Sequence, residues 1–117
     1  MRLRFLPLLL VAVTGLALAP VAAPHSTAAR KTVITVTAKE FKFVLSKKTV
    51  PHGVVVFKIT NKGKLKHDFK ISGKKSALIS PGKTATLTVT LSKGSKPYLC
   101  TVPGHAAGGM KGKLTVT

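Results

Sequence analysis

The sequence has almost no cysteine, and this scarcity limits how the protein can be held together. Cys100 is the one cysteine among 117 residues, so no disulfide bond can form within the chain. Small exported domains often depend on such bonds. A lone thiol in an oxidising compartment is a liability unless it is buried, bound to a metal or paired with another chain. The sequence therefore excludes an internal disulfide framework.

Acidic residues are also scarce. Glu40 and Asp68 stand against 20 lysines and arginines, which gives a formal net charge of +18. Such an imbalance favours acidic partners, anionic surfaces or nucleic acid. The lysines alternate with apolar residues and form no long block, which is typical of the solvated face of a sheet. With five phenylalanines and one tyrosine, most at expected core positions, the chain lacks exposed aromatic residues between its basic ones, so no nucleic-acid partner is expected.

Helical periodicity is missing beyond the first 29 residues. Segments such as 31–37 and 84–91 alternate in the manner of strands, and glycine and proline turns separate them. Six to eight short strands of this kind predict an all-β domain, an antiparallel β-sandwich or barrel. The residues expected in its core are Ile34, Val36, Phe43, Val55, Phe57, Ile59, Phe69, Ile71, Leu87, Val89, Tyr98, Leu114 and Val116.

A positively charged start and an apolar run precede the strands. Arg2 and Arg4 are followed by apolar residues over 5–19 and then by small residues, the pattern of a secretory signal peptide. A retained membrane anchor is the alternative, but a spanning helix needs about 20 apolar residues and this run is shorter. We therefore expect a helical signal peptide over 1–29, with possible cleavage segments at 21–23 and 27–29. One exported domain over 30–117, periplasmic or extracellular and not membrane-spanning, would remain.

Sulfur and imidazole side chains gather in one segment near the C-terminus. Cys100, His105 and Met110 follow the spacing Cys-x4-His-x4-Met, in a stretch rich in proline, glycine and alanine. Soft sulfur ligands select copper, and imidazole suits copper in either oxidation state. Two histidines and a cysteine with a weak axial methionine form the ligand set of blue-copper sites. Zinc is the weaker alternative, because zinc sites use Cys and His without a thioether.

A second histidine must come from elsewhere in the chain. His25 lies near the expected cleavage segments, and His52 lies in a turn over 51–53 that indicates a surface position. His67 begins the alternating segment 67–71, where a strand end would hold its side chain rigidly at the mouth of a sandwich. We therefore select His67. Taken alone, Cys100 or Met110 would be an ordinary core residue, so the prediction depends on the joint pattern.

The segments "YLCTVPGHAAGGMKGKLTV" and "NKGKLKHDFKI" resemble the cupredoxin family, the plastocyanin and azurin group of blue copper proteins, and the likeness extends over 32–117. The resemblance implies an eight-stranded Greek-key β-sandwich. It implies one copper site, with the ligands His67, Cys100, His105 and Met110. The loop has four residues between Cys and His and four between His and Met, which matches neither the plastocyanin nor the azurin spacing. The reduction potential and the partner are therefore not inherited from either subgroup.

One position beside the ligands departs from the family. The residue after the first ligand histidine is commonly Asn, and its side chain joins the two ligand loops, whereas here it is Asp68. We expect this carboxylate to accept hydrogen bonds from the backbone near Thr101. Its negative charge close to copper should favour Cu(II) and lower the reduction potential.

The expected function is one-electron transfer by an exported type-1 copper protein. The small residues over 106–109 would form an apolar contact patch around His105, and the lysines would steer redox partners with acidic docking surfaces. The alternative is copper storage, delivery or resistance outside the cytoplasm with the same ligands. We do not expect an enzyme, because a four-ligand site leaves no open position for a substrate.

Overall fold

The structure, a computed structural model, describes residues 7, 10–21 and 30–117. Over 10–21 the chain forms neither helix nor strand, so the signal-peptide helix expected over 1–29 is not formed in this range. An isolated helix with no packing partner is marginal in water, which accounts for the difference. His25 and almost all of the two cleavage segments lie outside the described residues. Among the described residues, no helix has the length and apolar character that a membrane crossing needs.

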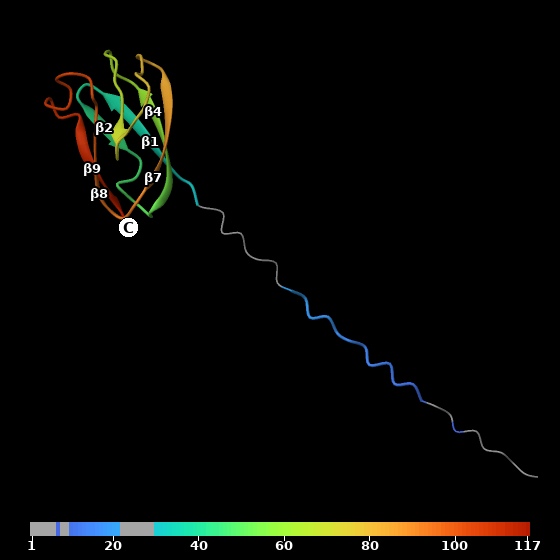
Figure 1. Cartoon of the computed structure of the whole chain (residues 1–117). Coiled ribbons are helices and arrows are strands. Elements are labelled where there is room, and N and C mark those ends of the chain that lie inside the picture. Colours follow the sequence, from blue (N-terminus) through green and yellow to red (C-terminus); the bar gives the residue numbers. More distant parts are fainter. Residues whose placement is uncertain (1–6, 8–9, 22–29) are drawn as a thin grey trace, which may run out of the picture.

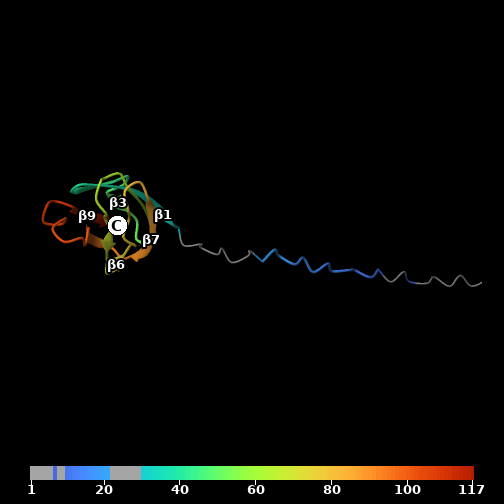
Figure 2. The same ribbon diagram turned by 90° about the horizontal axis from the view of Figure 1, so that it is seen from above.

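In the described part of the chain, nine strands form two facing sheets (Figures 1 and 2). One sheet has the order β2-β1-β4-β7 and the other has the order β3-β9-β8-β5-β6. The all-β sandwich predicted from the alternating segments is therefore confirmed. The strand bounds are β1 Thr32–Lys39, β2 Lys42–Leu45, β3 Thr49–Val50, β4 Gly53–Asn61, β5 Lys70–Ile71, β6 Lys74–Lys75, β7 Thr84–Leu91, β8 Gly94–Leu99 and β9 Lys111–Val116.

The sheets are mixed, although antiparallel sheets were expected. Most neighbours are antiparallel, but β1 runs parallel to β4, with Ile34 opposite Phe57, and β3 runs parallel to β9, with Val50 opposite Val116. The reason is the connection between the strands. After the β1–β2 hairpin the chain crosses to the other sheet as β3, and it then returns beside β1 as β4. Alternation along a strand reports which side faces the core, but it does not report the direction of the neighbour.

The core lies between the sheets and is built by alternate residues of each strand. In β1 the buried side chains are Ile34, Val36 and Ala38, while their neighbours face outward. The predicted core residues are all buried except three that are partly buried and pack against the core, Phe43, Leu87 and Tyr98. Further buried apolar side chains that the pattern did not identify are Ala38, Leu45, Val50, Ile79, Leu91, Cys100 and Met110.

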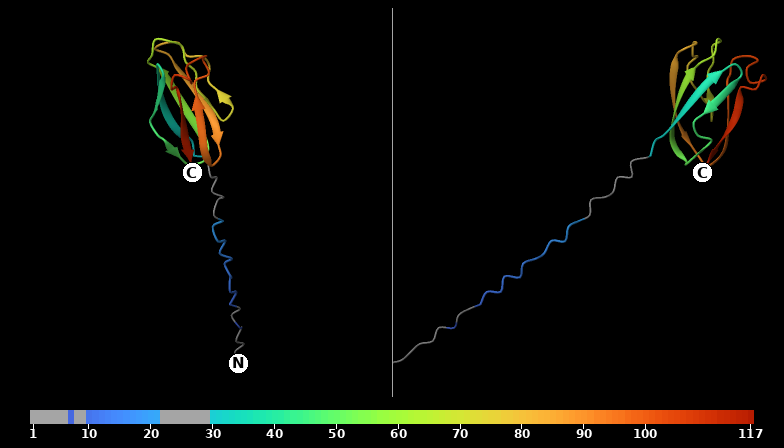
Figure 3. Two further views of the ribbon diagram at one scale, coloured as in Figure 1. Left: turned by 90° about the vertical axis from the view of Figure 1, so that its left-hand side faces the viewer. Right: turned by 180° about the vertical axis from the view of Figure 1, so that it is seen from behind.

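The expected ligand segments lie at one pole of the sandwich. β4 ends at Asn61 and β8 ends at Leu99, and the segments that follow them lie at the end opposite the C-terminus (Figures 1 and 3). The parallel pairing of β1 with β4 places Ala38 opposite Asn61. The turn after β1 therefore lies at this same pole, beside the segment that leads to His67.

Truncation of Phe57 tests whether the core between the sheets holds the domain together. This ring is fully buried and packs against Phe69, with ring centroids 5.0 Å apart. We expect Phe57→Ala to lower the free energy of unfolding of the metal-free protein by about 3–5 kcal/mol, from lost burial and the cavity left behind. Denaturant titration measures the change. Val44→Ala, at an exposed site, is the control and should change it by less than about 0.5 kcal/mol; similar losses in both variants would contradict the described core.

Candidate metal centre

The loop from Cys100 to Met110 is closed by its own backbone. The Cys100 N–H donates to the Met110 carbonyl at 3.1 Å, so the two ends of the loop are fastened together just before β9 begins. Inside the loop, the Met110 N–H donates to the His105 carbonyl at 3.1 Å. Gly104 turns the chain with a φ of +83°, a conformation that favours glycine. As a result Cys100, His105 and Met110 are all buried within one short turn-rich segment.

His67 comes to the same place from the segment between β4 and β5, which connects the two sheets. Its N–H donates to the Ile79 carbonyl at 3.1 Å, and the Ile79 N–H donates back at 2.7 Å. The segment 67–71 was expected to be one strand that His67 begins, but β5 covers only Lys70–Ile71. The Phe69 N–H donates to the Ser76 side chain instead of to a neighbouring strand, which shortens the ladder. His67 is nevertheless fixed by its two backbone bonds, and its side chain is fully buried.

The donor atoms of three predicted ligands converge. Nδ1 of His67 lies 3.0 Å from Nδ1 of His105, and Sγ of Cys100 lies 3.6 Å from that same His105 atom. The ligand atoms of these three residues lie within 4.8 Å of one another. His52 does not join them: its side chain is exposed, with Nδ1 2.9 Å from the carbonyl oxygen of the C-terminal Thr117.

Asp68 connects the two ligand segments as expected. The backbone N–H of Thr101 donates to Asp68 Oδ1 at 2.6 Å, and the Thr101 hydroxyl donates to Oδ2. In the chain, Asp68 directly follows His67 and Thr101 directly follows Cys100, both predicted ligands. The carboxylate therefore joins the residue after His67 to the residue after Cys100.

The surroundings of Cys100 favour the neutral form of its thiol. Burial raises the pKa of this thiol, and the nearby negative charge of Asp68 acts in the same direction. A metal ion that binds Cys100 as a thiolate would displace this proton.

Two residues beside this cluster were missed by the sequence analysis. Glu40 accepts hydrogen bonds from the loop before His67, and these lower the pKa of its carboxyl to about 2, the Leu65 N–H having the largest effect. Phe41 places its ring edge-on to the His105 ring, with centroids 5.1 Å apart at 73°. The segment 40–43 alternates charge and aromatic ring, which indicated an outer sheet face. The scarcity of acids was the one signal that could have identified Glu40.

The small residues around His105 form an exposed surface, but the ring itself is nearly covered. Ala107, Gly108 and Gly109 are exposed, whereas His105 keeps only 7% of its surface accessible. Phe41, at 41% exposure, lies against the same loop. The expected apolar patch is therefore extended by an aromatic residue from a different part of the chain.

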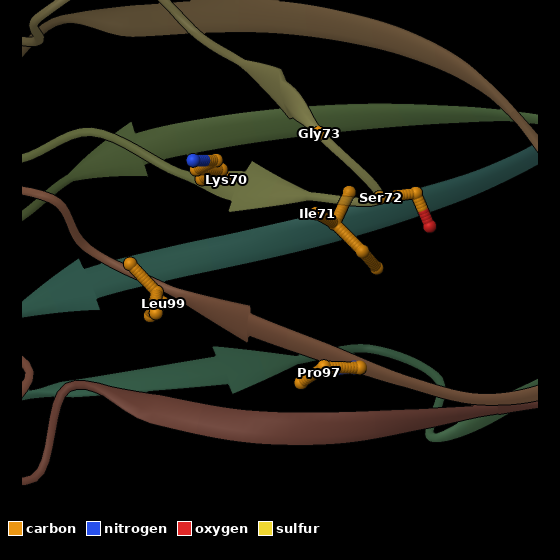
Figure 4. Close-up of a pocket in the computed structure, with 6 residues that line it drawn as sticks. All are labelled: Lys70, Ile71, Ser72, Gly73, Pro97 and Leu99. Carbon is orange, nitrogen blue, oxygen red and sulfur yellow. The ribbon is translucent and has the colours of Figure 1, made fainter.

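A shallow hollow lies on strands β5 and β8 (Figure 4). Its cavity volume is about 290 Å³, and its lining is mostly apolar with one lysine at its edge. No His, Cys or acidic side chain lines it. The lining residues are Lys70, Ile71, Ser72, Gly73, Pro97 and Leu99.

A β-sandwich that buries two imidazoles and a thiol together at one pole defines a class of soft-metal binding domain. The sequence model of copper-binding proteins of the plastocyanin/azurin family matches residues 23–117, and the chain belongs to this family. This match confirms the expected resemblance to cupredoxins, their fold and copper as the cofactor.

Individual relatives agree with this assignment. The chain is 43% identical over 53 residues to the copper-resistant cuproprotein CopI of Pseudomonas aeruginosa, which covers 44% of this chain and 27% of that protein. The chain thus spans about a quarter of that curated relative. Reduced auracyanin of Roseiflexus castenholzii superposes with a TM-score of 0.65 at 25% identity, over 74% of this chain and 97% of that one. Auracyanin A of Chloroflexus aurantiacus, a blue copper protein, gives 0.66 at 22% identity, over 75% and 100%.

Replacement of Asp68 by Asn tests the charge beside the ligand segments. Asn keeps one acceptor oxygen for Thr101 but removes the negative charge, so Cu(II) loses more stabilisation than Cu(I). We expect Asp68→Asn to raise the reduction potential of the copper-loaded protein, measured by voltammetry. Thr101→Val, which removes the hydroxyl donor and keeps the charge, should change the potential less. An unchanged or lower potential in Asp68→Asn would contradict the assigned role of the carboxylate.

Proposed function

We propose that this protein carries single electrons outside the cytoplasm, with one copper ion held by His67, Cys100, His105 and Met110. The observation that supports the proposal is the convergence of two imidazole nitrogens and a thiol sulfur in a buried site within 4.8 Å of one another. The fully buried Met110 ends the same loop and offers the thioether that completes the set. Soft sulfur with imidazole is the donor chemistry that suits copper.

The chain's contribution is to hold the donors in place and keep water away. When bound, copper supplies the one-electron change between Cu(I) and Cu(II). His67 is fixed by its bonds to Ile79, and the Cys100–Met110 loop is closed by its own backbone bond. Donors fixed in this way would move little between the two oxidation states. Burial of Cys100 and Met110 would also exclude competing ligands.

The surface near His105 suits brief contact with a redox partner. Ala107, Gly108 and Gly109 are small and exposed, so a partner could approach the edge of the buried ring closely. The lysine-rich surface would attract partners that carry acidic docking surfaces and would speed the encounter more than it strengthens the complex. Release would then be fast, as electron exchange requires.

A second function, copper handling, is favoured by one relative. The likeness to the copper-resistant cuproprotein CopI extends over 53 residues at 43% identity. The same four donors would then store or deliver copper, again after export directed by the N-terminal segment. Transfer of Cu(I) to the chelator bathocuproine disulfonate separates the two functions. A rate that rises with chelator concentration would favour delivery, whereas slow, concentration-independent loss would favour electron transfer.

Loading with Cu(II) tests the metal site directly. We expect the wild-type protein to become intensely blue or green, because a thiolate bound to Cu(II) gives strong charge-transfer absorption. Cys100→Ser should remove this absorption, as measured by visible and electron paramagnetic resonance spectroscopy. His52→Ala is the matched control, because His52 is exposed and lies apart from the donor cluster. A colourless wild-type protein would overturn the proposal.

The lysine surface predicts how electron exchange depends on salt. With ferricyanide, an anionic oxidant, the second-order rate should fall by a factor on the order of ten between about 0.01 and 0.15 M ionic strength, because screening removes the attraction. With a cationic cobalt(III) complex the rate should rise over the same range. Stopped-flow recording of the appearance of the Cu(II) absorption, starting from the Cu(I) protein, measures both rates. Equal salt dependence with the two oxidants would exclude steering by the lysines.

A further inference from the structure

The carboxylate of Glu40 contacts the imidazole of His67 from the side opposite the donor cluster. Glu40 Oε1 lies 3.2 Å from Nε2 of His67, and the Glu40 side chain is 28% exposed while that of His67 is fully buried. Nδ1 of the same ring faces His105 at 3.0 Å. The two nitrogens of His67 thus have separate partners: Nδ1 points to the metal donors and Nε2 points to a carboxylate.

This arrangement assigns the proton of the ring. When Nδ1 is the donor to a metal, the proton of a neutral imidazole sits on Nε2, and Nε2 donates it to the Glu40 oxygen. A carboxylate that accepts this proton fixes the tautomer and the orientation of a ligand histidine and makes the ring a stronger donor. Glu40 is placed to act on the metal through His67 without touching it.

The position of Glu40 is built by the surrounding loop. The same oxygen accepts the Lys64 N–H at 2.7 Å and the Leu65 N–H at 2.6 Å, so the loop before His67 is gathered around one carboxylate. Gly63 makes room for it, because a Cβ there would lie 2.5 Å from Oε1 and 2.6 Å from Oε2. A side chain at 63 would displace the carboxylate.

Asn61 braces the loop from the other side. Its side-chain amide donates to the carbonyls of Leu65 and Ile79, both at 2.8 Å, and its Oδ1 accepts the Gly63 N–H at 2.9 Å. Ile79 is the residue that pairs with His67 through the backbone. One network therefore holds the loop, the carboxylate and the imidazole in a single arrangement.

We propose that Glu40 is a positioning residue of the metal centre, which orients His67 through Nε2 and lowers the reduction potential by favouring Cu(II). This inference rests on the proposed copper site. Charge supports it: the chain has two acidic side chains against 20 basic ones, and both contact groups at this pole. Glu40 acts beside His67 and Asp68 acts beside Cys100. The two negative charges would offset the cationic surface where Cu(II) adds positive charge.

Three variants test the role of Glu40. Glu40→Gln keeps the shape and an acceptor oxygen but removes the charge; Glu40→Ala removes both; Gly63→Ala keeps the carboxylate but displaces it. In Glu40→Ala we expect a loss of Cu(II) affinity of about 10–100-fold, measured by competition with a chelator. Each tenfold loss of Cu(II) relative to Cu(I) affinity raises the potential by about 59 mV for a one-electron couple. Glu40→Gln and Gly63→Ala should shift the potential in the same direction by less.

The matched control is Ser95→Lys, which changes the net charge by the same amount as Glu40→Gln. Ser95 is exposed and lies in β8 at the end far from Cys100, opposite Thr115. The reduction potential of the Ser95→Lys variant should stay at the wild-type value. Nitrogen-15 spectra of the Cu(I) form supply a second readout: the Nε2 proton of His67 should exchange slowly in wild-type protein and rapidly in Glu40→Ala.

The outcomes separate the two proposals. A wild-type protein that takes up no copper and shows no charge-transfer absorption overturns the proposed function and the tuning role together. A blue wild-type protein whose potential is unchanged in both Glu40→Gln and Glu40→Ala overturns the role of Glu40 alone. A shift of the reduction potential in Ser95→Lys equal to that in Glu40→Gln would also overturn the role of Glu40. The shift would then come from the net charge and not from the contact with His67.

Discussion

The main constraint on this structure is that it buries three donor groups, two imidazoles and a thiol, side by side in a small core that has no disulfide. A buried polar group without a partner costs about 1–3 kcal/mol, and several such groups would offset much of the stability of a small domain. Among the described residues, no buried side-chain nitrogen or oxygen lacks a hydrogen-bond partner. Hydrogen bonds of Asn61, Glu40 and Asp68 around the donors account for many of these partners.

The two poles of the sandwich carry different groups. Strands β1 and β4 bury Ile34, Val36 and Phe57 between the sheets, and that core gives the loops a fixed base. One pole carries the donor cluster and both acidic side chains, while the C-terminal residue and His52 lie at the other (Figures 1 and 3). The core cluster extends to the pole of the donor cluster through Cys100 and Met110, and hydrogen bonds of Asn61, Glu40 and Asp68 hold the loops around it.

The alternating segments and the loop spacing made much of this predictable. Alternation in β1, β4 and β7 identified the buried face, since successive side chains of a strand point to opposite sides. The spacing of Cys100, His105 and Met110 predicted a ligand loop, because so few residue types offer soft donors, and the structure brings Cys100 and His105 together with His67. Phe41 and Glu40 were missed for the same physical reason. Their contacts are with segments far along the chain, which local alternation does not report.

The sequence by itself determined the chemical inventory: one thiol, one suitable loop, a cationic surface and strands with a defined inner face. The tertiary structure decided which distant groups meet. The parallel pairing of β1 with β4 carries Glu40 to the loop before His67, and the pair of backbone bonds to Ile79 holds that histidine against His105. Alternation records only the side on which a residue lies, whereas the direction and neighbours of a strand follow from the packing of the whole chain.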